Sequence, residues 1–264
     1  MYDYGARFYD PSLSLWNSVD PLTAKYPGIS AYVYTFNNPI MFNDPTGMEG
    51  EGVDGIIVGE NGKELANDGI NDDRVYVTNE GTSYETIKFI KKNSGKSEVL
   101  NSSFKNSNVT EIESLESTRQ AMVNAVSGDN GKGGTADDNN REYGGSIMSD
   151  GSVKVGDPGP VTTPSEGAVF SNYQPSDKSR FHSRPSGTVD EGGELGTFGG
   201  TTTLGSTSET GYGQRPSPTD EKNAGSQTRY VFAKGDGTVY IYNNKGVQAT
   251  LPIKSFAKLK LRKK

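Results

Sequence analysis

Four polar residues have the side-chain types that hydrolytic chemistry uses. They are Glu142, His182, Ser217 and Asp220. His182 is the only histidine of the chain, and Ser217 stands three residues before Asp220. A hydrolytic zinc ion needs about three protein ligands and one open position for water, and it accepts imidazole and carboxylate ligands. Each residue also has an ordinary structural explanation: a surface turn for the histidine, a helix N-cap for the serine and a solvated strand for the glutamate.

The order of these residues resembles that of JAMM (MPN-type) zinc metalloproteases, and most closely the JAB-like toxin domains of bacterial polymorphic toxins. The resemblance rests on a glutamate, a histidine-containing turn at Phe181–Gly187 and a Ser-x-x-Asp pair, in that order. It implies that Glu142 is the base that deprotonates a metal-bound water. It further implies that His182 and Asp220 bind Zn²⁺, and that Ser217 donates to the oxyanion formed when a peptide or isopeptide bond is cleaved.

One position departs from the family pattern. The family has a second histidine two positions after the first, and this chain has Arg184 there. A guanidinium has no lone pair for zinc and adds a positive charge, so zinc binding should be weakened or lost. We expect Arg184 to lie within hydrogen-bonding distance of Asp220 or Glu142 and to lower the pKa of that carboxylate. The sequence leaves open whether the domain is inactive or works without a metal.

Residues 1–48 differ from the rest of the chain because they are rich in aromatic residues separated by Asp-Pro and Asn-Pro turns. This pattern predicts short strands and tight loops in a segment too small to bury its own rings. The motifs Tyr2-Asp-Tyr-Gly-Ala-Arg-Phe-Tyr-Asp-Pro11 and Asn43-Asp-Pro-Thr-Gly-Met48 resemble the C-terminal end of the Rhs repeat-associated core domain. The resemblance implies a parent chain whose β-shell encloses a C-terminal toxin.

Two aspartates of this segment correspond to residues that cut related Rhs shells after the Asp-Pro-x-Gly-[Leu/Met] signature. By this resemblance they are Asp20 and Asp44, and the cut follows Met48. Two neighbouring carboxylates can divide the roles of acid and base. The alternative is that both are ordinary turn residues, and Val19 stands where cutting shells have a basic residue.

The remaining chain predicts a mixture of strands and helices. We expect a weakly structured connector over residues 49–108 with short strands at 55–59 and 74–78, and a strand or helix at 83–92. We expect a helix at 110–126, capped by Thr110 and Glu113, and a short helix at 221–224. We expect further strands at 142–148, 152–155, 229–233, 237–242 and 246–251. The polar stretch 201–213 should be a lid or a disordered loop.

These elements predict an α+β fold with a mixed sheet flanked by helices, similar to JAMM and deaminase folds. The expected division is a β-rich core remnant at 1–48, the connector at 49–108 and the toxin domain at 109–264.

Composition narrows the function classes. The chain has no cysteine, which excludes disulfides, Cys-ligated zinc and thiol nucleophiles. No apolar run is long enough to span a membrane. The net charge is −6, yet residues 254–264 carry six Lys or Arg and no acid, which indicates either a solvated terminus or a tail that binds an acidic partner.

The leading functional hypothesis is therefore the toxin region of an Rhs polymorphic toxin with a JAB-like zinc metallopeptidase domain. Its partners would be a peptide or isopeptide substrate, an immunity protein and the Rhs shell. No signal peptide is recognisable, so a larger exported chain or a separate machine would deliver it into a target cell. Two alternatives remain: a metal-free peptide-binding module, and a toxin that acts on nucleic acid through the basic tail.

Overall fold

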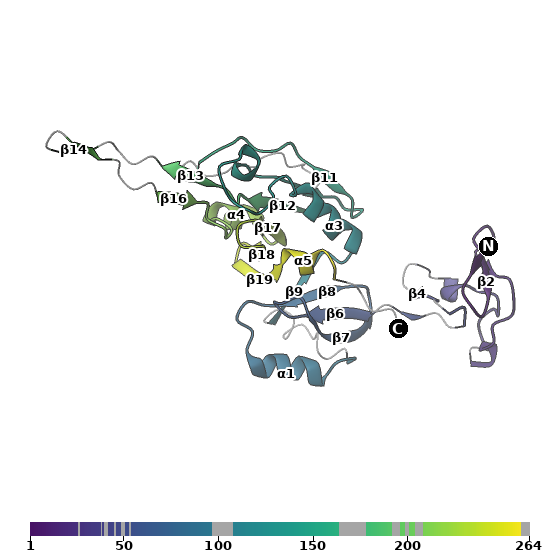
Figure 1. Cartoon of the computed structure of the whole chain (residues 1–264). Coiled ribbons are helices and arrows are strands. Elements are labelled where there is room, and N and C mark those ends of the chain that lie inside the picture. The colour runs from purple at the N-terminus through teal and green to yellow at the C-terminus, as the bar shows by residue number, and fades with distance from the viewer. Residues whose placement is uncertain are drawn as a thin grey trace.

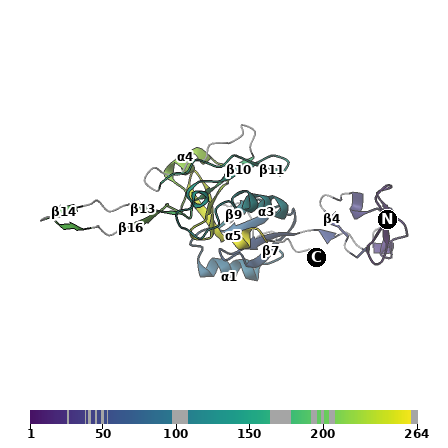
Figure 2. The same ribbon diagram turned by 45° about the horizontal axis from the view of Figure 1, so that its top comes forward.

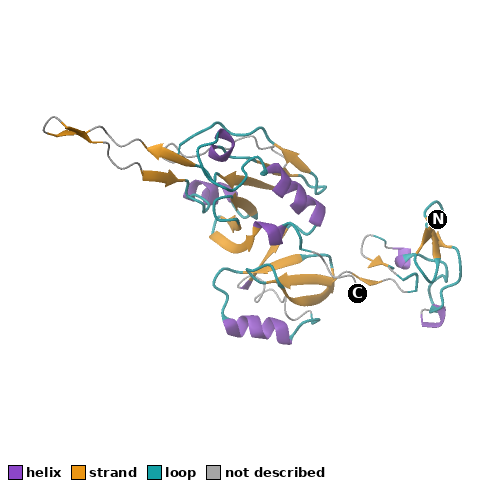
Figure 3. Cartoon of the chain, viewed as in Figure 1, coloured by secondary structure: helices purple, strands orange, loops and turns teal. Residues whose placement is uncertain are grey.

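The structure is a computed structural model of the 264-residue chain (Figure 1). It describes residues 1–25, 27–37, 39, 42–44, 46–48, 51–52, 54–96, 108–163, 178–191, 196–198, 201–203 and 208–259. Two sheets lie together with helices around them, and a small β-rich unit at the N-terminus lies apart from them (Figures 1 and 3).

The larger sheet has six strands in the order β11-β10-β12-β17-β18-β19. The strands are β10 (Gly144–Ile147), β11 (Val153–Val155), β12 (Ser179–Arg184), β17 (Arg229–Ala233), β18 (Thr238–Asn243) and β19 (Gly246–Pro252). Strand β12 runs parallel to β17, and the other neighbouring strands are antiparallel. The sheet is therefore mixed, and the expected strands of this region are confirmed.

Both faces of this sheet are covered, because alternate residues of its central strands point to opposite faces. On β17, Tyr230 and Phe232 join the main core, whereas Val231 and Ala233 join a second cluster. The helices that cover the sheet are α3 (Glu116–Ala125), α4 (Pro218–Ala224) and α5 (Ile253–Phe256). Residues of α3 and α5 join the main core, and Ala224 of α4 joins the second cluster. The α+β class is confirmed at this level.

A second sheet is built by residues that the sequence assigned to a connector. Its order is β7-β6-β8-β9, with β6 (Asp54–Val58), β7 (Glu64–Asn71), β8 (Val75–Thr78) and β9 (Val109–Ile112). Helix α1 (Tyr84–Lys92), which is capped by Ser83, packs on β7. Ile57 and Tyr76 pack with Ile90 of α1, whereas Ile56 and Val77 belong to the main core.

The predicted boundaries are therefore wrong in this part of the chain. Residues 54–96 are folded rather than weakly structured, and the boundary at 108/109 falls within a sheet because β9 pairs with β8. The prediction missed β7, whose sequence Glu-Leu-Ala-Asn-Asp-Gly-Ile-Asn is mostly polar. Such a strand is found at the edge of a sheet, where its pattern is weak.

The predicted helix at 110–126 divides into strand β9 and helix α3. Val109 and Ile112 are buried in β9, and the backbone pairing with β8 decides the conformation over helical spacing. The expected capping box at Thr110 and Glu113 is absent. The N-cap of α3 is Leu115, whose side chain makes no capping bond.

A long arm leaves the larger sheet between β12 and α4. Its described parts are two antiparallel pairs, β13 (Thr188–Glu191) with β16 (Ser208–Gly211) and β14 (Gly196–Phe198) with β15 (Thr201–Thr203). The arm extends away from the sheets in both views (Figures 1 and 2). The described residues of the stretch 201–213 therefore include strands and do not cover the sheet as a lid.

The N-terminal unit contains the predicted short strands. They are β1 (Tyr2–Asp3), β2 (Phe8–Asp10) and β3 (Leu15–Trp16), followed by the pair β4 (Phe42–Asn43) and β5 (Glu51–Gly52). Short 3₁₀ helices are η1 (Thr23–Lys25), η2 (Thr35–Asn37) and, later in the chain, η4 (Asp137–Asn140). The rings of Tyr4, Tyr9, Trp16 and Tyr34 pack against one another with centroids 4.3–6.2 Å apart. No helix within the described ranges has the length and apolarity to cross a bilayer.

Candidate functional site

Strand β12 carries two of the expected site residues on one face. His182 and Arg184 are two positions apart, so their side chains point to the same side of the sheet. The expectation that His182 lies in a turn is wrong, because it pairs with Gly144 of β10 and Val231 of β17. A Cβ on Gly144 would lie 2.9 Å from the Cα of His182, so glycine at this position allows the two strands to approach closely.

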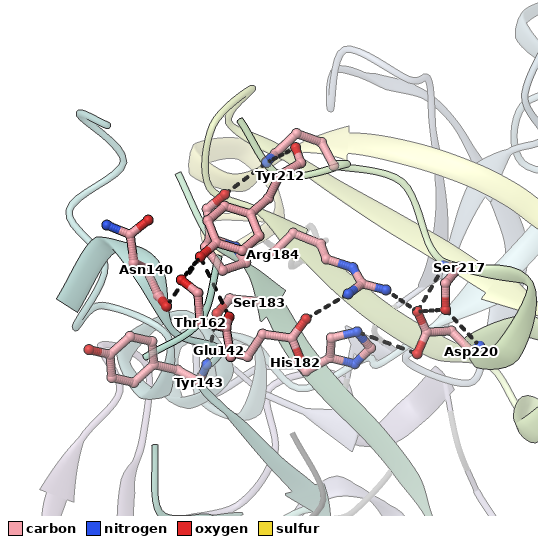
Figure 4. A network of polar contacts seen from close by, with 12 residues as sticks. Asn140, Glu142, Tyr143, Thr162, His182, Ser183, Arg184, Tyr212, Ser217 and Asp220 are labelled. Carbon is pink, nitrogen blue, oxygen red and sulfur yellow. Dashed lines mark hydrogen bonds and ion pairs between the residues drawn. The ribbon is translucent and has the colours of Figure 1, made fainter. Parts of the chain in front are cut away.

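Glu142 stands just before β10, and its main chain is fixed against β12. The backbone N–H of Tyr143 donates to the Ser183 hydroxyl at 2.9 Å, and the N–H of Ser183 donates to the Tyr143 carbonyl at 2.7 Å. These two bonds place the buried Glu142 side chain beside Arg184 (Figure 4). Glu142 was expected within a strand, and it precedes the strand instead.

Asp220 is supplied by the first turn of α4. Ser217 caps this helix: its hydroxyl accepts from the Asp220 N–H at 3.1 Å, and the Asp220 carboxylate accepts from the Ser217 N–H at 2.8 Å. The Ser217 hydroxyl also donates to Asp220 Oδ2 at 2.8 Å. This capping box fixes the carboxylate at the helix start, with one side turned towards β12.

Arg184 joins the two carboxylates. Its Nη1 donates to Glu142 Oε1 at 2.7 Å, and its Nη2 donates to Asp220 Oδ2. The side chains of Arg184, Glu142 and Asp220 are 13%, 3% and 21% exposed, so the contacts are largely shielded from water. The guanidinium lies between the two acids as a bridge (Figure 4).

His182 lies at the other side of Asp220. Its Nε2 is 3.7 Å from Asp220 Oδ1. Burial lowers the pKa of His182 to about 4, against the opposing attraction of Asp220. The imidazole is therefore neutral at pH 7, and the contact is one between a neutral ring and a carboxylate.

The two carboxyl groups respond differently to the same site. Burial raises the pKa of Glu142 to about 7, although the Arg184 charge opposes the shift. Burial also acts to raise the pKa of Asp220, but His182, Arg184 and the bonds from Ser217 outweigh it, so its pKa is lowered. The expected contact of Arg184 is found with both acids. The expected fall in pKa is found for Asp220. The pKa of Glu142 rises instead, because the effect of desolvation is larger than that of the Arg184 charge.

The four residues selected from the sequence thus converge, together with Arg184. The donors around a zinc ion would be His182 and Asp220, because Arg184 has no lone pair and its charge occupies the third position. Within the described ranges, no group of three His, Asp or Glu side chains has an arrangement that holds a metal ion. These side chains therefore do not fit a hydrolytic zinc ion.

A second charged centre lies in the N-terminal unit. Arg7 is 2% exposed, and its Nη1 is 3.1 Å from Asp20 Oδ2 while its Nη2 is 3.1 Å from Asp44 Oδ2. Its Nε donates to the Gly47 carbonyl, and its Nη2 also lies 3.3 Å from the Met48 carbonyl oxygen. Asp20 and Asp44, selected from the sequence, are therefore brought together by a residue that the sequence reasoning missed. The available signal was that Arg7 is the only basic residue among the first 24.

The described part of the basic tail is packed, because Phe256 and Leu259 belong to the main core and their carbonyls accept from the buried Arg119, whereas its lysines are exposed. Lys254 lies in α5 and Lys258 follows it, whereas the predicted tail beyond residue 259 lies outside the described residues.

Comparisons with known proteins give no match: no protein-family model, no curated protein and no solved structure is similar to this chain.

Proposed function

We propose that this chain is the C-terminal region of an Rhs polymorphic toxin and that its larger part is a JAB-like, JAMM-type domain. The observation that supports this most is the convergence of Glu142, His182, position 184 and Asp220 at one end of a mixed sheet. The aromatic β-rich unit that precedes the sheet supports the Rhs part of the proposal.

The order of the elements also agrees with a JAMM domain. A helix, α3, is followed by the hairpin β10–β11, and the site glutamate stands at the start of that hairpin. The histidine follows on the neighbouring strand, and the Ser-x-x-Asp pair begins a helix. Such a domain would act on a peptide or isopeptide bond.

In this chain the metal position is replaced by an ion pair. Arg184 places one positive charge between Glu142 and Asp220, where a bound cation would lie, but it cannot activate water as a metal does. We therefore propose that the domain as it stands does not hydrolyse peptides through zinc, and that position 184 decides this.

The test is the substitution Arg184→His. Residues 182 and 184 share a face of β12, so the variant presents two imidazoles and the Asp220 carboxylate to one point. We expect about one zinc ion per chain by elemental analysis, and cleavage of peptide or isopeptide substrates that the wild type leaves intact.

Arg180→His is the matched control, because it adds a histidine to the same strand face without filling position 184. If Arg184→His binds no zinc and cleaves nothing, the metallopeptidase proposal is wrong.

A metal-free binding module is the second candidate for this site. It is favoured by the fact that Arg184 already bonds both carboxylates, which leaves the fold intact without a metal. This candidate predicts that the wild-type chain binds peptide equally well with and without a chelator, measured by calorimetry. Loss of binding on chelation would remove it.

We also propose that the N-terminal unit cuts the chain after Met48 through Asp20 and Asp44, which would free the toxin domain from an Rhs shell. The closeness of both carboxylates to Arg7 supports this. In the proposed setting the parent chain is exported and delivered into a competing cell, and an immunity protein protects the producer. A small open reading frame for such a protein beside the gene is the simplest supporting observation.

A further inference from the structure

Arg7 has an unusual set of acceptors. Its Nε donates to the Gly47 carbonyl, and its Nη2 donates to Asp44 and to the Met48 carbonyl. Its Nη1 makes an ion pair with Asp20. Its Cζ lies 4.4 Å from the centre of the Trp16 ring, which covers one face of the group. The guanidinium is therefore fixed in position and directed at the main chain at the expected cut.

Asp44 holds Met48 through the backbone N–H of Met48. Its Oδ1 accepts a hydrogen bond from the Met48 N–H at 3.0 Å, while its Oδ2 contacts Arg7. The Asp44 side chain is 1% exposed, and burial raises its pKa. Met48 is thus bonded through its N–H to an acid and through its carbonyl oxygen to a cation.

A small cavity adjoins these groups. Arg7, Asp20 and Asp44 contribute to its lining, together with residues of the 29–36 segment. It leaves ≈ 20 Å³ for the centre of a water molecule, which is room for one water. A water molecule beside Arg7 and the two carboxylates therefore has a place in the structure.

We propose that Arg7 is a catalytic residue of the self-cleavage: it polarises the Met48 carbonyl and stabilises the oxyanion that forms there. This inference rests on the proposed cut after Met48. Water adds to the carbonyl carbon while the Asp20 carboxylate takes one of its protons, and the negative charge develops on the oxygen that faces Arg7. The C–N bond to residue 49 then breaks as Asp20 gives the proton that it took from the water to the leaving nitrogen, while the Asp44 carboxylate holds Arg7 and the Met48 N–H in place. The products are a carboxyl group on Met48 and a new amino terminus at residue 49.

A purely structural role for Arg7 makes a different prediction. A buried guanidinium between two aspartates can simply hold the loops together, and its loss would then unfold the unit. Trp16 separates the two roles, because it is the only tryptophan of the chain and is 2% exposed. Its emission maximum reports whether the unit remains folded.

The experiment follows the full 264-residue chain from its synthesis in cell-free translation, with fragments identified by intact mass. We expect the wild type to yield fragments 1–48 and 49–264, Asp44→Asn to remain uncut, and Arg7→Lys to cut about 10²- to 10³-fold more slowly. Arg7→Ala should regain cutting in millimolar methylguanidinium but not in methylammonium. Arg74→Lys, just before β8 of the second sheet, is the matched control and should cut as the wild type does.

The outcomes distinguish a failure of the proposed self-cleavage from a failure of the role proposed for Arg7. An uncut wild-type chain overturns the self-cleavage and this inference together. A wild type that is cut, with Arg7→Lys cut equally fast, overturns the role of Arg7 alone. If both Arg7 variants expose Trp16 and methylguanidinium restores nothing, Arg7 is structural and the inference is wrong.

Discussion

The two charged centres of this protein have the same composition, one arginine between two carboxylates, but the two arginines differ in their other contacts. In each, one arginine bridges two carboxylates: Arg7 bridges Asp20 and Asp44, and Arg184 bridges Glu142 and Asp220. Arg7 has further donors left for the main-chain carbonyls of Gly47 and Met48, whereas both terminal nitrogens of Arg184 bond carboxylates. The difference between the two centres is therefore what the N–H groups of the arginine face: main-chain carbonyls as well as carboxylates for Arg7, and carboxylates for Arg184.

The largest expected effect is that of Arg184→Met. It leaves Glu142 and Asp220 close together in a shielded site without a cation, which should lower the free energy of unfolding by about 3–5 kcal/mol. Denaturant unfolding at pH 8, followed by far-UV circular dichroism, measures this. The emission of Trp16 should stay unchanged, because the N-terminal unit lies apart from this centre. A loss under 1 kcal/mol would place the Arg184 bridge among ordinary surface pairs.

A smaller effect is expected from Glu142→Gln, and it depends on pH. The pKa of Glu142 is about 7 in the folded chain and 4.5 as the ordinary value, so the folded state binds the extra proton between these values. The wild type therefore loses stability as the pH rises through 7, by about 2–3 kcal/mol between pH 5 and pH 8.

The glutamine variant has no carboxyl to titrate at this position and should lack this loss. The measurement is the difference in unfolding free energy between the variant and the wild type at pH 5 and at pH 8. A difference that does not change with pH contradicts the burial of Glu142 as the dominant influence on its pKa.

Ser217→Ala should cost about 1 kcal/mol, because it removes the cap of α4 and one hydrogen bond to Asp220. The Arg184 bridge keeps Asp220 in place, so the site should survive. Thermal unfolding measures the cost, and Ser12→Ala on an exposed turn is the control. A cost above 3 kcal/mol would mean that the cap, and not Arg184, positions Asp220.

The smallest effect is expected for Glu80→Gln. Glu80 and Arg215 form a salt bridge at 2.9 Å, but the two side chains are 40% and 57% exposed. Such exposed pairs contribute about 0.2–1 kcal/mol, and less in high salt. Unfolding at low and high salt therefore provides the baseline against which the two shielded arginine centres are judged.

Much of the larger sheet could be predicted from local pattern. Strands β17 and β18 are short runs of aromatic and aliphatic residues, β19 alternates apolar and polar residues, and Gly-containing turns separate the three. The cap at Ser217 needs only residues three apart. The second sheet could not be predicted in this way. Val109–Ile112 suits a helix or a strand by its own pattern, and its pairing with a strand more than thirty residues earlier decides the outcome.

The sequence by itself determined the chemical identity of both centres. An arginine at position 184 has no lone pair whatever surrounds it, and the only basic side chain near Asp20 in the chain's first 24 residues is Arg7. Only the tertiary structure decided that Arg184 bonds both acids and that Arg7 faces the carbonyl of Met48. It also decided that the pKa of Glu142 rises beside a positive charge, because desolvation depends on burial by distant segments, and that burial is a property of the folded chain.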